Sequence, residues 1–191
     1  MLLLIDNFDS FSYILADYIK QLGFPLKIVR NDYPLEQLKT ETFAGLILSP
    51  GPETPSKAGH LKEIFAYYHD KIPVLGVCLG HQCIGEHFGA RLQRGKLPVH
   101  GKVFSVNRIY SHPVLEGLPE KFSVTRYHSL VLRDLPEVLI PILATNDGEL
   151  MGMVHRQLPI VGIQYHPEAY LTEYGLELIA NWARMIPSQH S

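Results

Sequence analysis

The stretch Gly76-Val77-Cys78-Leu79-Gly80-His81-Gln82 decides how this chain of 191 residues is interpreted. It ends the apolar run 74–77 and enters a helical pattern, residues 80–88, that stops at Gly89. This is the layout of a nucleophile elbow, where a sharp strand-to-helix turn presents one side chain outward. Strand and helix approach so closely that side chains two residues either side would clash, hence the two glycines. We predict Cys78 as a nucleophile with a strained backbone.

The two cysteines have different predicted roles because they occupy different positions relative to the predicted helix. A helix that begins after Cys78 directs free N–H groups toward the sulfur and favours the thiolate. A lone cysteine would more often be a buried structural residue, so the flanking glycines carry this prediction. Cys83 lies within the helical pattern and is interpreted as a small buried hydrophobe. A disulfide between them would conflict with the helix, so we expect thiols in a reducing, cytoplasmic compartment.

Working outward, short apolar runs alternate with helical patterns in the first half of the chain. The predicted strands are 2–6, 26–30, 44–48 and 74–77, and the predicted helices are 11–22, 59–70 and 80–88. Such βαβ units imply a parallel sheet covered on both faces. The second half predicts strands at 101–109, 123–132, 140–145, 150–154 and 160–165, then a helix at 173–185.

These patterns predict an α/β fold, with a mixed, mostly parallel open sheet and an antiparallel extension in the second half. No repeat or linker divides the chain, so we expect a single domain over residues 1–191. Ligands of such sheets bind beyond the carboxyl ends of the strands.

The amino-acid composition and net charge indicate which classes of binding partner to expect. Hydrophobic residues make up 46% and charged residues 19%, which is typical of a globular chain. The net charge is −2, with scattered Lys and Arg, so we expect no nucleic acid or membrane partner. No apolar run is long enough for a membrane span, and we expect no signal peptide.

A base for the cysteine is predicted in Gln164-Tyr165-His166-Pro167-Glu168, after the last predicted strand. In an extended chain residues two apart point the same way, so Glu168 can orient His166 while its other nitrogen serves Cys78. Alone, His-Pro-Glu would be interpreted as a surface turn. His81 is the rival base, but it should face away because adjacent helical residues diverge by about 100°. No histidine, cysteine and carboxylate set has metal-ligand spacing.

An oxyanion hole is predicted where the strand at 44–48 ends in Ser49-Pro50-Gly51-Pro52. The prolines lack an N–H, so Gly51 offers a single donor in a stiff loop, and the N–H of Leu79 would be the second. Taken alone, the loop fits a proline-rich turn equally well.

With these elements in place, the chain resembles the class I (triad-type) glutamine amidotransferases along nearly its whole length. It is most similar to the small subunits of anthranilate synthase and aminodeoxychorismate synthase. The matching segments are Leu4-Ile5-Asp6-Asn7-Phe8-Asp9-Ser10-Phe11, Ser49-Pro50-Gly51-Pro52, the Cys78 elbow, His100-Gly101-Lys102, Arg126-Tyr127-His128-Ser129-Leu130 and Gln164-Tyr165-His166-Pro167-Glu168.

The resemblance implies a flavodoxin-like fold and hydrolysis of L-glutamine by a triad of Cys78, His166 and Glu168. Glutamine and its oxyanion would be held by Gly51, Pro52, Glu53, Leu79, Gln82, Ser129 and Leu130. The ammonia would pass to a chorismate-binding synthase subunit, in a heterodimer or heterotetramer, for tryptophan or folate biosynthesis. No metal or organic cofactor is expected.

Two residues depart from the family pattern. Glu53 stands where the family often has a small residue such as Gly, and a positive φ there would cost about 1 kcal/mol. Ala169 replaces the usual Ser after His-Pro-Glu. Three other functions remain open: a stand-alone cysteine hydrolase or peptidase, a glutaminase subunit of another ammonia-using synthetase, and a non-enzymatic subunit that kept the fold.

Overall fold

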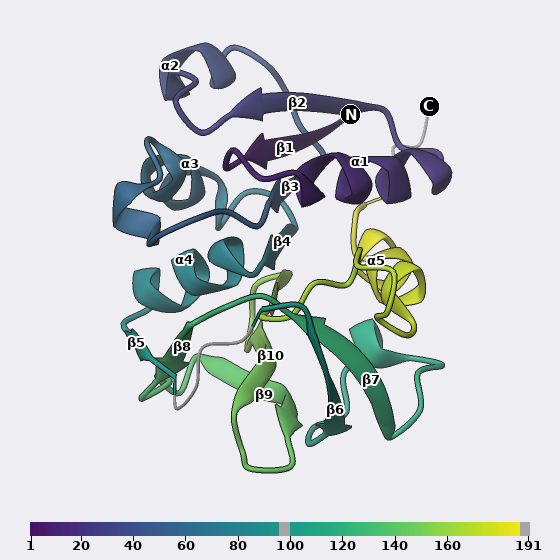
Figure 1. Cartoon of the computed structure of the whole chain (residues 1–191). Coiled ribbons are helices and arrows are strands. Elements are labelled where there is room, and N and C mark those ends of the chain that lie inside the picture. Colours follow the sequence, from purple (N-terminus) through teal and green to yellow (C-terminus); the bar gives the residue numbers. More distant parts are fainter. Residues whose placement is uncertain (96–99, 188–191) are drawn as a thin grey trace.

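The computed structural model describes residues 1–95 and 100–187 (Figure 1). Within them, nine strands form one sheet in the order β2-β1-β3-β4-β11-β10-β9-β6-β7. The strand bounds are β1 Leu2–Asp6, β2 Leu26–Arg30, β3 Gly45–Leu48, β4 Val74–Val77, β6 Lys102–Arg108, β7 Lys121–Arg126, β9 Leu139–Thr145, β10 Leu150–His155 and β11 Ile160–Ile163. The strands predicted at 2–6, 26–30 and 74–77 are confirmed to the residue.

The sheet changes direction at β11. Strands β2, β1, β3, β4 and β11 pair in parallel, with Ile163 opposite Val77 at the end of the last pair. Strands β10, β9, β6 and β7 add antiparallel neighbours beyond β11. The order 2-1-3-4 followed by a fifth parallel strand is that of flavodoxin-like sheets. The predicted mixed sheet with an antiparallel extension is therefore confirmed.

Helices cover both faces of the sheet (Figure 1). Helices α1 (Phe11–Gln21) and α5 (Gly175–Ala183) share one core cluster, in which Trp182 is fully buried. Helices α3 (Leu61–Tyr68) and α4 (Leu79–His87) belong to the other, together with Leu38 of the short α2 (Leu35–Leu38). The strands carry apolar side chains toward both clusters, which explains why their sequences are continuous apolar runs. The 3₁₀ turns are Pro55–Lys57 and Pro113–Leu115.

The prediction of one strand over 123–132 is wrong. The chain leaves the large sheet after Arg126, and β8 (Leu130–Arg133) pairs instead with β5 (Arg91–Arg94) in a two-stranded sheet. Just before the chain leaves this sheet, the backbone of His166 bridges to Thr125, whose other edge pairs with Val103 of β6. The sequence analysis missed β5 because Arg-Leu-Gln-Arg lacks a continuous apolar run.

The crossing of α4 over the sheet depends on Gly80. A Cβ at this position would lie 2.4 Å from the carbonyl oxygen of Leu48 and 2.6 Å from the Leu48 Cβ. These atoms belong to a buried strand and have no room to move. The glycine therefore sets how closely α4 approaches β3.

We predict that Gly80→Ala lowers the free energy of unfolding by roughly 3 kcal/mol, as expected for overpacking against rigid backbone. Gly23→Ala is the matched control, because no atom lies within 4 Å of its new Cβ and only its φ of +83° opposes the change. That strain costs about 1 kcal/mol. Urea titration of both variants measures the difference in their free energies of unfolding. An equal loss of stability in the two variants would contradict the close approach of α4 to β3.

Candidate active site

Cys78 lies between β4 and α4 in the backbone conformation that the elbow predicts. Its φ is 53° and its ψ is −99°, values that L-residues rarely adopt. Its N–H donates to the carbonyl of Ile163 at 2.8 Å, and its own carbonyl accepts from the N–H of Gln82 at 3.0 Å. These bonds tie the strained residue to β11 and to the first turn of α4. The side chain is 6% exposed and lines the cavities described below.

His166 and Glu168 meet as the sequence predicts. Nδ1 of His166 and Oε1 of Glu168 are 2.7 Å apart, and both side chains are almost fully buried. The backbone N–H of His166 donates to the carbonyl oxygen of Thr125 at 3.0 Å, and the Thr172 hydroxyl donates to the carbonyl oxygen of His166 at 2.7 Å. The imidazole is therefore fixed by its backbone as well as by Glu168. Nε2 completes no hydrogen bond with any described group, which leaves this nitrogen for Cys78.

The surroundings of His166 favour its protonated form. Burial alone would lower the pKa of the imidazole, but its interactions with Cys78 and Glu168 outweigh burial and raise the pKa to about 10. The rings of Phe11 and Tyr127 pack around the imidazole, with centroids 4.8 and 5.0 Å away. A cationic imidazole beside the sulfur stabilises a thiolate, the nucleophilic form of cysteine.

The loop at Gly51 is held by Asn7, a residue for which the sequence analysis had no such role. The N–H of Asn7 donates to Ser49 Oγ and its Nδ2 donates to the Ser49 carbonyl, both at 2.9 Å. Asn31 completes the set by donating to Asn7 Oδ1 at 3.0 Å. A Cβ on Gly51 would lie 2.5 Å from the Asn7 Cβ, so a larger residue does not fit. The sequence position of Asn7 could have indicated this contact, because Asn7 directly follows β1 and so lies at the same edge of the sheet as the Gly51 loop after β3.

Two cavities meet at Cys78. The smaller, of about 130 Å³, is lined by Gly51, Pro52, Glu53, Cys78, Gln82, Tyr127, His128, Ser129 and Leu130. It thus brings together every predicted substrate contact except Leu79, whose predicted contribution is a backbone N–H. The larger cavity, of about 400 Å³, is lined by residues 8–11 and 50–52 with Cys78, His100, Tyr127 and His166.

Glu53 has the positive φ that the sequence analysis considered, at 62°. Its carboxylate forms an ion pair with Lys57 at 3.1 Å, and both side chains are more than half exposed. The charge is therefore partly neutralised and screened by solvent, which weakens any repulsion of an anionic substrate.

The rival residues lie away from the cavities. His81 is fully buried beside Gly162, and burial lowers its pKa to about 4. Cys83 is also fully buried, and burial raises its pKa to about 12. A neutral imidazole and a protonated thiol outside the site do not compete with His166 and Cys78.

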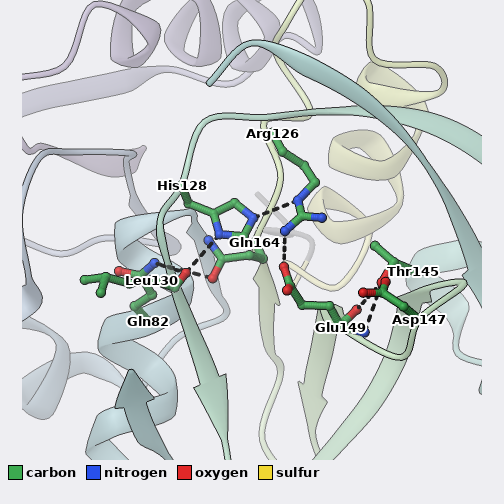
Figure 2. A network of polar contacts seen from close by, with 8 residues as sticks. All are labelled: Gln82, Arg126, His128, Leu130, Thr145, Asp147, Glu149 and Gln164. Carbon is green, nitrogen blue, oxygen red and sulfur yellow. Dashed lines mark hydrogen bonds and ion pairs between the residues drawn. The ribbon is translucent and has the colours of Figure 1, made fainter. Parts of the chain in front are cut away.

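Further polar residues stand behind the smaller cavity, and the sequence analysis did not assign them. Figure 2 shows Arg126, Glu149 and Gln164 beside Gln82 and His128. In residues 1–95 and 100–187, no group of three or more His, Cys, Asp or Glu is arranged to hold a metal ion. A cavity of about 720 Å³ at the amino ends of the strands is lined mainly by apolar residues such as Leu22 and Ile186 and lies far from these groups.

Fold and site together define a cysteine-dependent acyl-transfer enzyme on an open α/β sheet. The model of the family "Glutamine amidotransferase class-I" matches residues 3–186, so the chain belongs to that family. Anthranilate synthase component 2 of Pseudomonas aeruginosa is 44% identical, over 96% of this chain and 95% of the relative. Aminodeoxychorismate synthase component 2 of Serratia marcescens is 42% identical, over 95% and 98%.

A solved structure supports the same fold. A putative GMP synthase subunit from Thermoplasma acidophilum superimposes with a TM-score of 0.87, at 27% identity, over 97% of this chain and 92% of that one. None of the helices in the described ranges has the length and apolar character that crossing a membrane requires.

The buried neutral histidines predict an acid-sensitive fold. Folded-state pKa values of about 4 for His81 and about 3 for His128 lie below the usual 6.5, so the unfolded chain binds more protons at mildly acidic pH. We therefore expect the free energy of unfolding to fall as pH drops from about 6.5 to about 4, by up to about 1.4 kcal/mol per unit for each histidine. His81→Gln should make this slope shallower in urea titrations at several pH values. An unchanged slope would contradict burial of a neutral His81.

Proposed function

We propose that this chain is the glutamine-hydrolysing subunit of a chorismate-using synthase. One observation carries the proposal: a cavity of about 130 Å³ is lined by Cys78 together with Gly51, Gln82, Ser129 and Leu130. That volume is well below the roughly 300–1,000 Å³ of pockets for drug-sized ligands, so it suits a small amino acid. A peptide substrate would need a longer groove, which argues against a stand-alone peptidase.

The proposed reaction begins with attack of the Cys78 thiolate on the carboxamide carbon of glutamine. The oxyanion that forms accepts hydrogen bonds from the N–H groups of Gly51 and Leu79. His166, protonated and oriented by Glu168, gives its proton to the nitrogen, and the C–N bond breaks to release ammonia. Water then attacks the thioester carbon as His166 removes its proton. Glutamate leaves and the thiolate is restored.

We predict that Cys78→Ala abolishes glutamine hydrolysis, with a loss of many thousand-fold, as for other triad nucleophiles. Cys83→Ala is the matched control, and it should keep the rate because this thiol lies in the core. A glutamine-analogue electrophile, followed by peptide mass mapping, should label Cys78 alone. Label on Cys83, or normal turnover by Cys78→Ala, would show that the proposed mechanism is wrong.

A partner subunit is supported by the surface around the site. Phe8 lines the larger cavity and is 53% exposed, and Tyr170 and Leu171, just after Glu168, are 97% and 56% exposed. Exposed aromatic and aliphatic side chains of this kind are typical of protein interfaces. We propose that the synthase docks here, over the Asn7-Phe8-Asp9-Ser10 loop and the segment after Pro52, and receives the ammonia. Both relatives described above are named as component 2 of a synthase.

We predict slow glutamine hydrolysis by the isolated chain and faster hydrolysis with the chorismate-binding synthase, most of all with chorismate bound. A tenfold gain requires the partner to favour the competent state by only about 1.4 kcal/mol. Steady-state glutaminase assays with purified anthranilate synthase and aminodeoxychorismate synthase partners measure this and identify the pathway. Full activity alone, unaffected by either synthase, would contradict the subunit role. Stimulation by a different ammonia-using synthetase would reassign the partner and leave the Cys78 chemistry intact.

A further inference from the structure

A buried ion pair lies beside His128, one of the residues that line the smaller cavity (Figure 2). Arg126, the last residue of β7, pairs through Nη2 with Oε1 of Glu149, which directly precedes β10. The two side chains are 5% and 7% exposed, and the Phe104 ring lies 4.5 Å from the guanidinium carbon. Desolvating two charges costs so much that apolar replacements are often equally stable. Stability alone therefore does not account for this pair.

The guanidinium group also fixes a histidine. Nε of Arg126 donates to Nε2 of His128 at 3.0 Å. Because a guanidinium has donors and no acceptor, Nε2 carries no proton and the proton of the neutral ring is on Nδ1. That nitrogen lies 2.9 Å from the carbonyl oxygen of Leu130, to which it donates. Burial and the nearby Arg126 charge lower the pKa of His128 to about 3, which agrees with a neutral ring.

The Leu130 carbonyl is where this network reaches the cavity wall. It also accepts from Nε2 of Gln82 at 3.3 Å, and the same amide group donates to Oε1 of Gln164 at 3.4 Å. The preceding carbonyl, of Ser129, accepts from the N–H of Gly95 at 2.9 Å. The peptide groups of Ser129 and Leu130 are thus held in one orientation, next to the Gln82 side chain, and all three residues line the cavity.

We propose that Arg126 and Glu149 are positioning residues for substrate binding. The ion pair orients the guanidinium, the guanidinium selects the Nδ1–H tautomer of His128, and His128 orients the Leu130 carbonyl and the wall that holds the substrate. The inference rests on the proposed function in taking glutamine as that substrate. Since neither Arg126 nor Glu149 is among the residues that line the cavity with Cys78, the ion pair acts on binding more than on the chemical step.

Arg126→Lys separates this role from simple charge pairing. Lysine keeps a cation beside Glu149, but it lacks the Nε–H that meets His128. We expect a melting temperature close to that of the wild type, a rise of about tenfold in KM for glutamine, and a kcat within about twofold of the wild-type value. This pattern indicates the loss of an interaction that stabilises the bound substrate and the transition state equally. Alkylation of Cys78 by iodoacetamide should keep its rate, whereas labelling by a glutamine-analogue electrophile should slow down.

Arg126→Met combined with Glu149→Leu tests the structural alternative. The pair removes both charges and so avoids leaving one of them buried alone. A purely structural ion pair predicts a normal KM in this double variant, whereas a positioning role predicts a KM as high as in Arg126→Lys. Arg91→Met is the control, because it breaks an exposed ion pair, Arg91 with Asp134, at the start of β5, and should leave KM unchanged.

A spectroscopic readout keeps the inference testable apart from turnover. The ¹⁵N shifts of His128 should report the Nδ1–H tautomer in the wild type and a mixture of tautomers in Arg126→Lys. Unchanged tautomer and KM in both Arg126 variants would overturn the inference, as would equal slowing of iodoacetamide and analogue labelling. Failure of Cys78→Ala to abolish turnover would instead refute the proposed function, and the tautomer measurement would still stand.

Discussion

The strained turn at Cys78 is the constraint on which the rest of the site depends. A residue with φ of 53° is tolerated only where its surroundings fix it, and here β11 accepts its N–H while α4 begins at the next residue. The turn requires α4 to cross close to β3 and β4, which leaves no space for a side chain at Gly80. Because parallel strands end at one edge, the same geometry brings the Gly51 loop and His166 to the sulfur.

Environment, more than residue type, assigns the roles of three buried histidines. His166 sits between a carboxylate and a thiol, and these neighbours raise its pKa to about 10 despite burial. His128 is buried and faces a guanidinium group, and His81 is fully buried with no partner for either ring nitrogen among the described residues, so their pKa values fall to about 3 and about 4. One imidazole is therefore suited to donate a proton, while the other two remain neutral parts of the structure.

Much of the site was predictable because its motifs are local. The elbow at Cys78, the donor at Gly51 and the pair of His166 with Glu168 each depend on residues within a few positions of one another. The separation of β7 from β8 was not predictable, because their partners are distant in the sequence: His166 bridges Thr125 from 41 positions away, and β8 pairs with β5. The pairing of Arg126 with Glu149 was not predicted for the same reason, since neither residue has a local pattern that indicates a buried partner.

The sequence by itself determined the alternation of strands and helices, the strained turn, and which residues end the parallel strands. These features follow from steric limits on neighbouring residues and from apolar periodicity, both of which act over short stretches. Only the tertiary structure decided that Asn7 holds the Gly51 loop and that Arg126 is hydrogen-bonded to His128 in the lining of the smaller cavity. Those outcomes depend on burial and on hydrogen bonds between distant segments, whose free energies arise only once the core has closed.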